Sequence, residues 1–425
     1  MNILNLEINL WKKLMKNKYY RFIHNHINNL YHYDEIIRKQ YYPRSTENYN
    51  ENEQIEKSNE MIRRPFWNVI VPGLICCLYS FGLFVYLIWP DIVYVHPFFL
   101  IVPHMYPANI RIYCSIMSLI WGVNYIFQVF YGLSTDLRHY QFLHILHLNK
   151  SNGRGLDQEN LRRLRLFRDR MFSIERLTCS SIGFSAWIAV SFNVIQQRLW
   201  QYSILGLFFW SAIFIPWCLY VSSGLYQFPA FIVTINYYLI LKQKSLQQKM
   251  HRFYLRLIRS NRKSFPGRYF EFVRLNKAFV ELQKEIVFNS MQLVRFLSIL
   301  FISFSVALTY LTCVLFLAWM PILYIIVYLI IYVAHLISLS AFIQYGSKIE
   351  YLNRNFLRFN RKCLCNEHHF FSNKYLLKQE SVTSTMLECP VGMMLLDGCV
   401  ITGRTQFALM INISTFFYLI CRRIT

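Results

Sequence analysis

Charged residues are scarce in this chain of 425 residues: they make up 16% of it, against 55% hydrophobic and 18% aromatic residues. A soluble globular protein carries about a quarter charged residues. The shortage of charge and the abundance of apolar side chains exclude a disordered chain, a coiled coil and an ordinary soluble enzyme. The composition therefore predicts a polytopic membrane protein.

Acidic residues are scarcer still, since 22 Asp and Glu face 45 Lys and Arg and leave a net charge of +23. In a soluble protein this balance would suggest a nucleic-acid partner. In a membrane protein, basic residues gather instead in the cytoplasmic segments. The positions of the basic residues favour the interpretation as a membrane protein, so we expect membrane lipids and no nucleic acid among the partners.

Motifs that carry catalysis or ion coupling are missing. The sequence has no Gly-rich phosphate loop, nucleophile elbow or His-Glu-x-x-His motif. No Asp or Glu lies deep in an apolar run, so a carboxylate proton relay has no candidate. No cysteine pair falls in a segment expected outside the cell, and we expect no extracellular disulfide. An ion-coupled transporter and a membrane hydrolase both lose support.

Two groups of residues leave an alternative open. His335 is the only histidine well inside an apolar run, and membrane acyltransferases use a buried histidine; the simpler interpretation is a histidine bonded to a neighbouring helix. Cys363 and Cys365 precede His368 and His369, but this spacing is not that of a standard zinc site. We favour reduced cysteines in a cytoplasmic loop, with no metal, no cofactor and no catalytic residue.

Long apolar runs are the main feature that is present. A bilayer core of about 30 Å requires roughly 20 apolar residues in a helix. The runs do not alternate between polar and apolar residues as the strands of a membrane barrel do, so the sequence predicts an all-α fold with seven transmembrane helices. The runs are Trp67–Trp89, Ile112–Leu133, Leu177–Ile195, Ile204–Leu241, Phe296–Trp319, Pro321–Ile343 and a split run, Val391–Ile401 with Thr405–Cys421.

The fourth run is long enough to hold two spans that turn at Ser222–Gly224. With seven spans, 39 basic residues fall on one side of the membrane and four on the other. An eighth span would place two strongly basic loops on opposite sides, against the tendency of Lys and Arg to stay in the cytoplasm. The charges favour seven spans, with the amino terminus in the cytoplasm and the carboxyl terminus outside. This orientation is opposite to that of G-protein-coupled receptors.

The segments between the spans are expected to be helical as well. Apolar residues at helical spacing in Leu161–Ile174 and Leu255–Ile286 predict helices that continue the spans into the cytoplasm, with Leu275, Phe279 and Leu282 on one face. The expected parts are a cytoplasmic segment (1–66), spans one to four (67–241), a cytoplasmic helical extension (242–295), spans five and six (296–343), a cytoplasmic loop (344–390) and the split last span (391–425).

The carboxyl-terminal segment carries a family motif. After Thr402–Phe407 an apolar stretch leads to Thr415 and Phe416, then to five apolar residues and to Arg422 and Arg423. This pattern resembles the final span of arthropod gustatory receptors, of the insect chemoreceptor superfamily, whose signature is Thr-Tyr, five apolar residues and Gln-Phe. Phe416 stands where the family has Tyr, and the two arginines replace Gln-Phe. The seven spans, their orientation and the large cytoplasmic loops are similar to the family along the whole chain.

The resemblance implies a gustatory receptor that acts as a ligand-gated non-selective cation channel in the plasma membrane of chemosensory neurons, opened by a small-molecule tastant. It also implies a homo- or heterotetramer of related subunits, with four copies of the last span lining the pore. The cytoplasmic helical extension would form the main subunit contact, and spans one to four would hold the ligand. The alternative is a non-channel transporter or lipid-handling protein of the same topology.

The last span allows a pore on physical grounds too. A break at Gly403-Arg404 can give two helical pieces, and the outer piece carries Ser414, Thr415 and Tyr418 among apolar residues. A hydrophobic ring can gate a pore by dewetting, and the family register makes Leu419 the gate candidate. The alternative is that these residues simply pack between helices.

Arg422 and Arg423 depart from the family pattern. In a homotetramer they would place eight positive charges, two from each subunit, near the outer mouth. A ring of basic charge disfavours cations. Either the side chains turn outward to lipid head groups, or the pore is heteromeric, or it conducts poorly.

Aromatic residues in spans two to four are the ligand-binding candidates, because small-ligand pockets are lined by aromatic side chains with a few polar groups. Tryptophan and tyrosine also fill membrane cores and form interface belts, which is the alternative for each of them. An aromatic lining suits an apolar or bitter-type tastant better than a sugar. The candidates are Trp121, Tyr125, Trp187, Trp210, Trp217 and Tyr220.

Overall fold

The computed structural model describes residues 74–91, 104–134, 156–198, 204–259, 267–366, 373–388, 391–395 and 398–424. The chain divides into two compact units, Met1–Pro72 and Gly73–Thr425, and every described residue belongs to the second unit. These residues form helices and no β-strand; a single antiparallel bridge joins Met394 to Val400. The predicted helical fold is confirmed for them, whereas the expected segment 1–66 lies outside the described residues.

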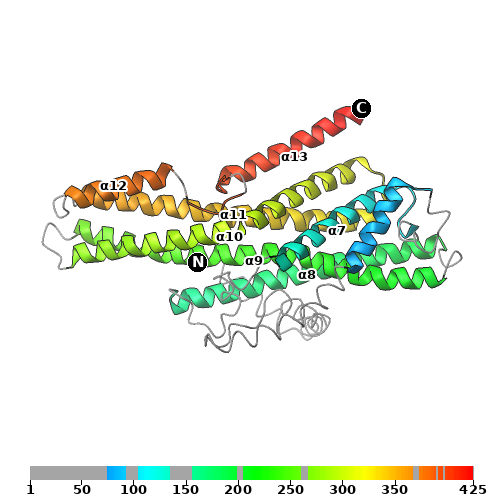
Figure 1. Cartoon of the computed structure of the whole chain (residues 1–425), viewed down its shortest axis with the longest axis horizontal. Coiled ribbons are helices and arrows are strands. Elements are labelled where there is room, and N and C mark those ends of the chain that lie inside the picture. Colours follow the sequence, from blue (N-terminus) through cyan, green and yellow to red (C-terminus); the bar gives the residue numbers. More distant parts are fainter. Residues whose placement is uncertain are drawn as a thin grey trace. The chain divides into compact units, whose positions relative to one another are not determined.

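Long helices make up most of the unit (Figure 1). The α9 helix packs against α8 and α11, and α10 packs against α11 and α9. The α12 helix lies on α11, while α13 contacts α10 and α11. The helices are Leu74–Ile88, α7 (Arg111–Ser134), α8 (Gln158–Gln196), α9 (Ile204–Arg259), α10 (Arg268–Leu317), α11 (Ile322–Asn366), α12 (Asn373–Glu388) and α13 (Gly403–Ile424).

The α9 helix settles the question of the long fourth run. Its 56 residues continue through Ser222–Gly224 without a break, which corresponds to about 84 Å at 1.5 Å per residue. The run is therefore one helix that extends beyond a bilayer thickness, as the charge distribution predicts. The α8 helix likewise joins the predicted Leu161–Ile174 helix to the third apolar run.

The predicted helix Leu255–Ile286 is wrong as a continuous element. The α9 helix ends at Arg259 and α10 begins at Arg268, directly after Gly267. Gly267 has a φ of 81°, a left-handed conformation that is accessible to glycine at little cost and that ends regular helical geometry. The apolar face that the pattern predicts on the second half is confirmed, because Leu275, Phe279 and Leu282 are all buried.

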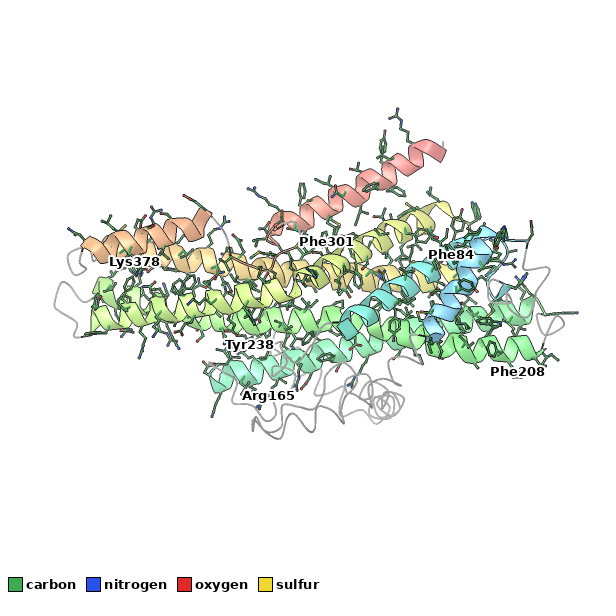
Figure 2. All side chains as sticks on the ribbon, viewed as in Figure 1. Phe84, Arg165, Phe208, Tyr238, Phe301 and Lys378 are labelled. Atoms are coloured by element: carbon green, nitrogen blue, oxygen red, sulfur yellow. The ribbon has the colours of Figure 1, made fainter. Side chains whose placement is uncertain are left out.

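Several helices are suited to a membrane. Among the described residues, Gln158–Gln196, Leu293–Leu317 and Ile322–Cys365 contain stretches long and apolar enough to cross one, and Leu74–Ile88 and Ile204–Leu219 are shorter apolar helices. Large apolar side chains also point away from the protein, including Phe84 on the first helix and Phe208 on α9 (Figure 2). Apolar surface of this extent is typical of contact with lipid.

The last segment differs from the expected two helical pieces, because the first piece is a hairpin. Its backbone folds back on itself through bonds from Leu395 N to Cys399 O (3.0 Å) and from Ile401 N to Met393 O (2.8 Å). Gly398 has a φ of 78° in this turn, which favours glycine. Met393 and Ile401 are fully buried and pack against the protein, and the described residues 391–395 and 398–401 do not continue a helix. The outer piece is helical, as predicted, and forms α13.

Candidate functional site

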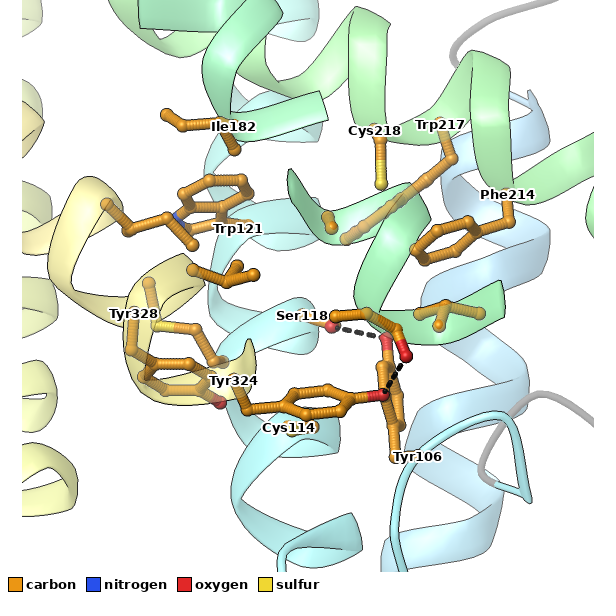
Figure 3. A pocket seen from close by; sticks show the side chains of 16 residues that line it. Tyr106, Cys114, Ser118, Trp121, Ile182, Phe214, Trp217, Cys218, Tyr324 and Tyr328 are labelled. Carbon is orange, nitrogen blue, oxygen red and sulfur yellow. Dashed lines mark hydrogen bonds between the residues drawn. The ribbon is translucent and has the colours of Figure 1, made fainter. Parts of the chain in front are cut away.

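A cavity of about 60 Å³ lies between α7, α8, α9 and α11, beside the loop that precedes α7 (Figure 3). Its lining is almost wholly apolar. Trp121 comes from α7, Ile182 from α8 and Trp217 from α9, and Tyr324 and Tyr328 come from α11. The cavity therefore depends on how four helices pack, and any movement among them changes its shape.

Most of the polar atoms at the edge of the cavity form hydrogen bonds with one another or with the backbone. The Tyr106 hydroxyl lies 2.9 Å from the Tyr79 hydroxyl and 3.0 Å from Ser118 Oγ, and each pair shares a hydrogen bond. Tyr324 donates a weaker hydrogen bond to Met105 O at 3.4 Å. Trp121 Nε1, by contrast, is buried and has no hydrogen-bond partner in the described part of the chain. Trp217 Nε1, on the opposite wall, is buried without a partner in the same way. Among the described residues the site thus offers a guest large apolar surfaces and two indole donors.

The structure brings two of the six predicted ligand residues to the cavity, Trp121 and Trp217. Tyr125 and Trp210 are buried but are not among the lining side chains. Trp187 is 46% exposed on α8, on the outer surface next to Phe184, whose ring centroid is 6.2 Å away. Tyr220 lies on α9, and its side chain is outside the described residues.

Sequence reasoning missed other lining residues. Tyr324 and Tyr328 are separated by four positions on α11 and so share one face of that helix; this spacing is visible in the sequence. Tyr106 gives no comparable signal, because it lies in a loop between apolar runs. Its hydroxyl bonds to Tyr79 and Ser118, which only the folded structure brings together.

His335 lies behind the wall of the cavity and not in its lining. Its side chain is 1% exposed, and Nδ1 lies 2.7 Å from the Tyr226 hydroxyl and 2.9 Å from Ile331 O. The ring packs against Phe304, with ring centroids 4.7 Å apart. These contacts agree with the packed histidine of the sequence analysis. Cys363 is buried and Cys365 exposed at the end of α11, while His368 and His369 lie outside the described residues.

The edge of the cavity formed by the loop before α7 is hydrogen-bonded to the end of α8. Asn193 Nδ2 donates to Met105 O at 2.8 Å and to His104 O at 3.4 Å. Burial of the His104 imidazole, helped by the nearby positive charge of Arg111, lowers its pKa from 6.5 to about 4. His104 is therefore neutral at physiological pH, and protonating it in acid would disturb this edge.

The predicted pore residues lie on a helix that is little covered by the rest of the chain. On α13, Ser414 and Thr415 are exposed, as are Tyr418 (63%) and Leu419 (49%). Arg422 is exposed, and the side chain of Arg423 is outside the described residues. The Phe417 ring lies 5.6 Å from that of Phe316 on α10. One side of α13 thus contacts α10 and α11, and its apolar remainder is left uncovered.

The sequence matches no protein-family model and no curated protein. The fold, however, is similar to solved structures of an insect olfactory receptor. It is similar to the insect olfactory receptor OR5 from Machilis hrabei, with 10% sequence identity and a TM-score of 0.58 over 93% of this chain and 98% of that chain. It is equally similar to OR5 in complex with eugenol, with 9% identity and a TM-score of 0.59 over 91% and 96% of the two chains. At this identity the likeness shows the fold.

Proposed function

We propose that this protein is a gustatory receptor of the insect chemoreceptor superfamily that acts as a ligand-gated non-selective cation channel. The observation that carries the proposal is the fold similarity to an olfactory receptor, which runs over 93% of this chain and 98% of the other. The carboxyl-terminal motif around Thr415 and Phe416 supports the gustatory branch. The proposed protein has seven spans, a cytoplasmic amino terminus and an outer carboxyl terminus, in the plasma membrane of chemosensory neurons.

In this proposal the cavity at Trp121 and Trp217 holds the tastant. Pockets for drug-sized ligands measure roughly 300–1,000 Å³, whereas one water molecule needs about 10–15 Å³ of cavity volume. A cavity of about 60 Å³ fits only a small molecule unless the helices part. The apolar lining favours a compact aromatic or aliphatic compound, and Trp121 Nε1 can donate to a single acceptor atom on it. Eugenol, which OR5 binds, has this character and is a suitable first probe.

The pore of the proposed channel is lined by α13 from four subunits, identical or related. The uncovered apolar side of α13 supports this assignment, because an exposed apolar helix face requires either lipid or another subunit. Leu419 and Tyr418 are exposed on this helix, and a ring of four Leu419 side chains would be an apolar constriction that closes by dewetting. The cytoplasmic parts of α9 to α12 would form the main contact between subunits.

The proposal is tested by whole-cell current in cells that express the chain, alone and with related subunits, against a tastant panel that includes eugenol. We expect a ligand-evoked cation current, and we expect Leu419→Ala to raise the current in the absence of ligand by weakening the apolar constriction. Surface labelling confirms delivery to the plasma membrane. Surface expression without current under any of these conditions would rule out the channel function, and current that Leu419→Ala leaves unchanged would rule out the gate.

A further inference from the structure

Three buried amide side chains meet where the cytoplasmic parts of α9, α10 and α11 come together. Asn353 of α11 accepts hydrogen bonds at Oδ1 from Gln243 Nε2 of α9 (2.6 Å) and from Gln283 Nε2 of α10 (2.5 Å). Each of the three residues is no more than 5% exposed. Because both acceptor positions of Asn353 Oδ1 are used by other helices, its amide nitrogen is held in one direction.

That nitrogen points to the hairpin before α13. Asn353 Nδ2 donates to Val391 O at 2.8 Å. On the other side, Ser290 Oγ of α10 accepts a hydrogen bond from Met394 N at 2.9 Å. The hairpin of residues 391–401 is therefore bonded to α10 and α11 by two side chains that are buried in the protein. A buried hydrogen bond stabilises modestly when made and is costly to leave unmade.

Close packing supports these bonds. A Cβ atom at Gly346 of α11 would lie 3.2 Å from Ile401 Cγ2, and one at Gly392 would lie 2.7 Å from Val400 Cγ1. The first contact places the hairpin against α11 and the second holds its two arms together, so a larger residue at either glycine would change the packing. Directly after it, Thr402 N donates to Thr405 Oγ1 at 3.1 Å and fixes the first turn of α13. Beyond that turn most of α13 is uncovered, so its direction depends strongly on how its start is held.

We propose that the hairpin of residues 391–401 holds α13 in its resting position, and we call this hairpin the latch. Asn353 is the positioning residue that keeps the latch bonded to α11. The inference rests on the proposed function, because it assigns to the latch the resting position of the pore helix. Asn353 is bonded both to the amide cluster of α9, α10 and α11 and to the hairpin. A movement of these three helices is therefore transmitted through Asn353 to the start of α13. Loosening the latch lets α13 leave its resting position more easily, which raises the current without ligand.

Two variants open the latch from opposite sides. Asn353→Leu keeps a similar side-chain size and removes the bond to Val391 O together with the acceptor for Gln243 and Gln283. Ser290→Ala removes only the acceptor for Met394 N. Asn360→Leu is the matched control: Asn360 is equally buried on the same helix, but its Nδ2 donates to Thr383 Oγ1 of α12 at 3.3 Å. Ser290→Ala is the milder change and keeps the test valid if Asn353→Leu does not fold.

Hydrogen exchange of the full chain in lipid nanodiscs is the first measurement, because it needs no current. We expect exchange in residues 391–410 to be about two- to tenfold faster in Asn353→Leu and Ser290→Ala, the equivalent of one hydrogen bond. Asn360→Leu should instead affect residues 373–388. Unchanged exchange in 391–410 for a folded Ser290→Ala variant overturns the latch, whether or not the protein conducts.

Current without ligand is the second measurement. Both latch variants should raise it about two- to tenfold relative to wild type and to Asn360→Leu, after correction for surface expression. Faster exchange together with unchanged current, in a receptor that responds to ligand, overturns the role of the latch in the pore. A wild-type chain that never conducts contradicts the proposed function instead, and the exchange in 403–410 then decides by itself whether the latch holds α13.

Discussion

Trp121 stacks on His335, with ring centroids 5.9 Å apart and ring planes 23° from parallel. Trp121 lines the cavity, whereas His335 lies one helical turn beyond the lining residue Ile331. On its other sides His335 contacts Phe304 of α10 and Tyr226 of α9. The cavity wall is therefore continuous with a buried contact among α9, α10 and α11, and a change at Trp121 has consequences both for ligand binding and for helix packing.

Trp121→Ala should weaken the response to a small ligand. The substitution removes a ring face and a hydrogen-bond donor from the cavity, so we expect the half-maximal concentration of an active ligand to rise about tenfold or more, equivalent to about 1.4 kcal/mol. Loss of the buried ring should also destabilise the protein by about 3 kcal/mol. Trp187→Ala is the control, because Trp187 is 46% exposed and away from the cavity. Equal losses in the two variants would contradict the assignment of the cavity.

Gly122→Ala should destabilise the contact between the first helix and α7. An added Cβ would lie 2.0 Å from Ser80 Oγ, whereas the next atoms, Ser80 Cβ and Cys76 Sγ, are 3.4 and 3.6 Å away. Overpacking of this kind costs about 1–3 kcal/mol. The double variant Gly122→Ala/Ser80→Ala removes the clash and should recover most of the loss. Thermal unfolding in detergent measures both variants, and a double variant no more stable than the single one would disprove the predicted contact.

Acid should destabilise the edge of the cavity formed by the loop before α7, because it protonates His104. Its pKa is about 4 in the folded protein against an ordinary value of 6.5, so the unfolded chain binds the proton more readily. The stability that this histidine contributes is complete above pH 6.5 and is lost as the pH falls toward 4. Because the side chain is partly exposed, we expect an effect on the order of 1 kcal/mol. His104→Gln cannot titrate, so its melting temperature should change less than that of wild type over this interval; identical pH profiles would exclude His104 as the cause.

The sequence predicts the elements of this protein better than their contacts. Apolar runs and helical spacing are local properties, which is why α9 and the buried face of Leu275, Phe279 and Leu282 follow from them. The hairpin of residues 391–401 does not follow, because its composition is as apolar as that of a span and its shape depends on Gly398 and on bonds to Asn353 and Ser290.

The cavity shows the same limit. Trp121, Trp187 and Trp217 look equivalent in the sequence, since each is a tryptophan in an apolar run. Which of them faces the interior depends on the rotation of each helix about its axis and on its neighbours. That rotation is fixed by long-range contacts such as the one between Asn193 and Met105, and no periodicity within a single helix reveals them.

Replacing the arginine pair near the end of α13 should increase cation conduction. Arg422 is exposed, and in the proposed homotetramer the pair Arg422 and Arg423 would bring eight positive charges to the outer mouth. The double variant Arg422→Gln/Arg423→Phe introduces the uncharged Gln-Phe pair of the gustatory-receptor motif. We expect a larger ligand-evoked cation current and a weaker dependence of conductance on ionic strength, because salt screens exposed charges over about 10 Å at 0.1 M. The control is Arg256→Gln, which removes a charge, paired with Glu271, from the carboxyl-terminal end of α9. If the double variant conducts like wild type at low and at high salt, the arginines point away from the ion path toward lipid head groups, and the positive ring at the mouth is excluded.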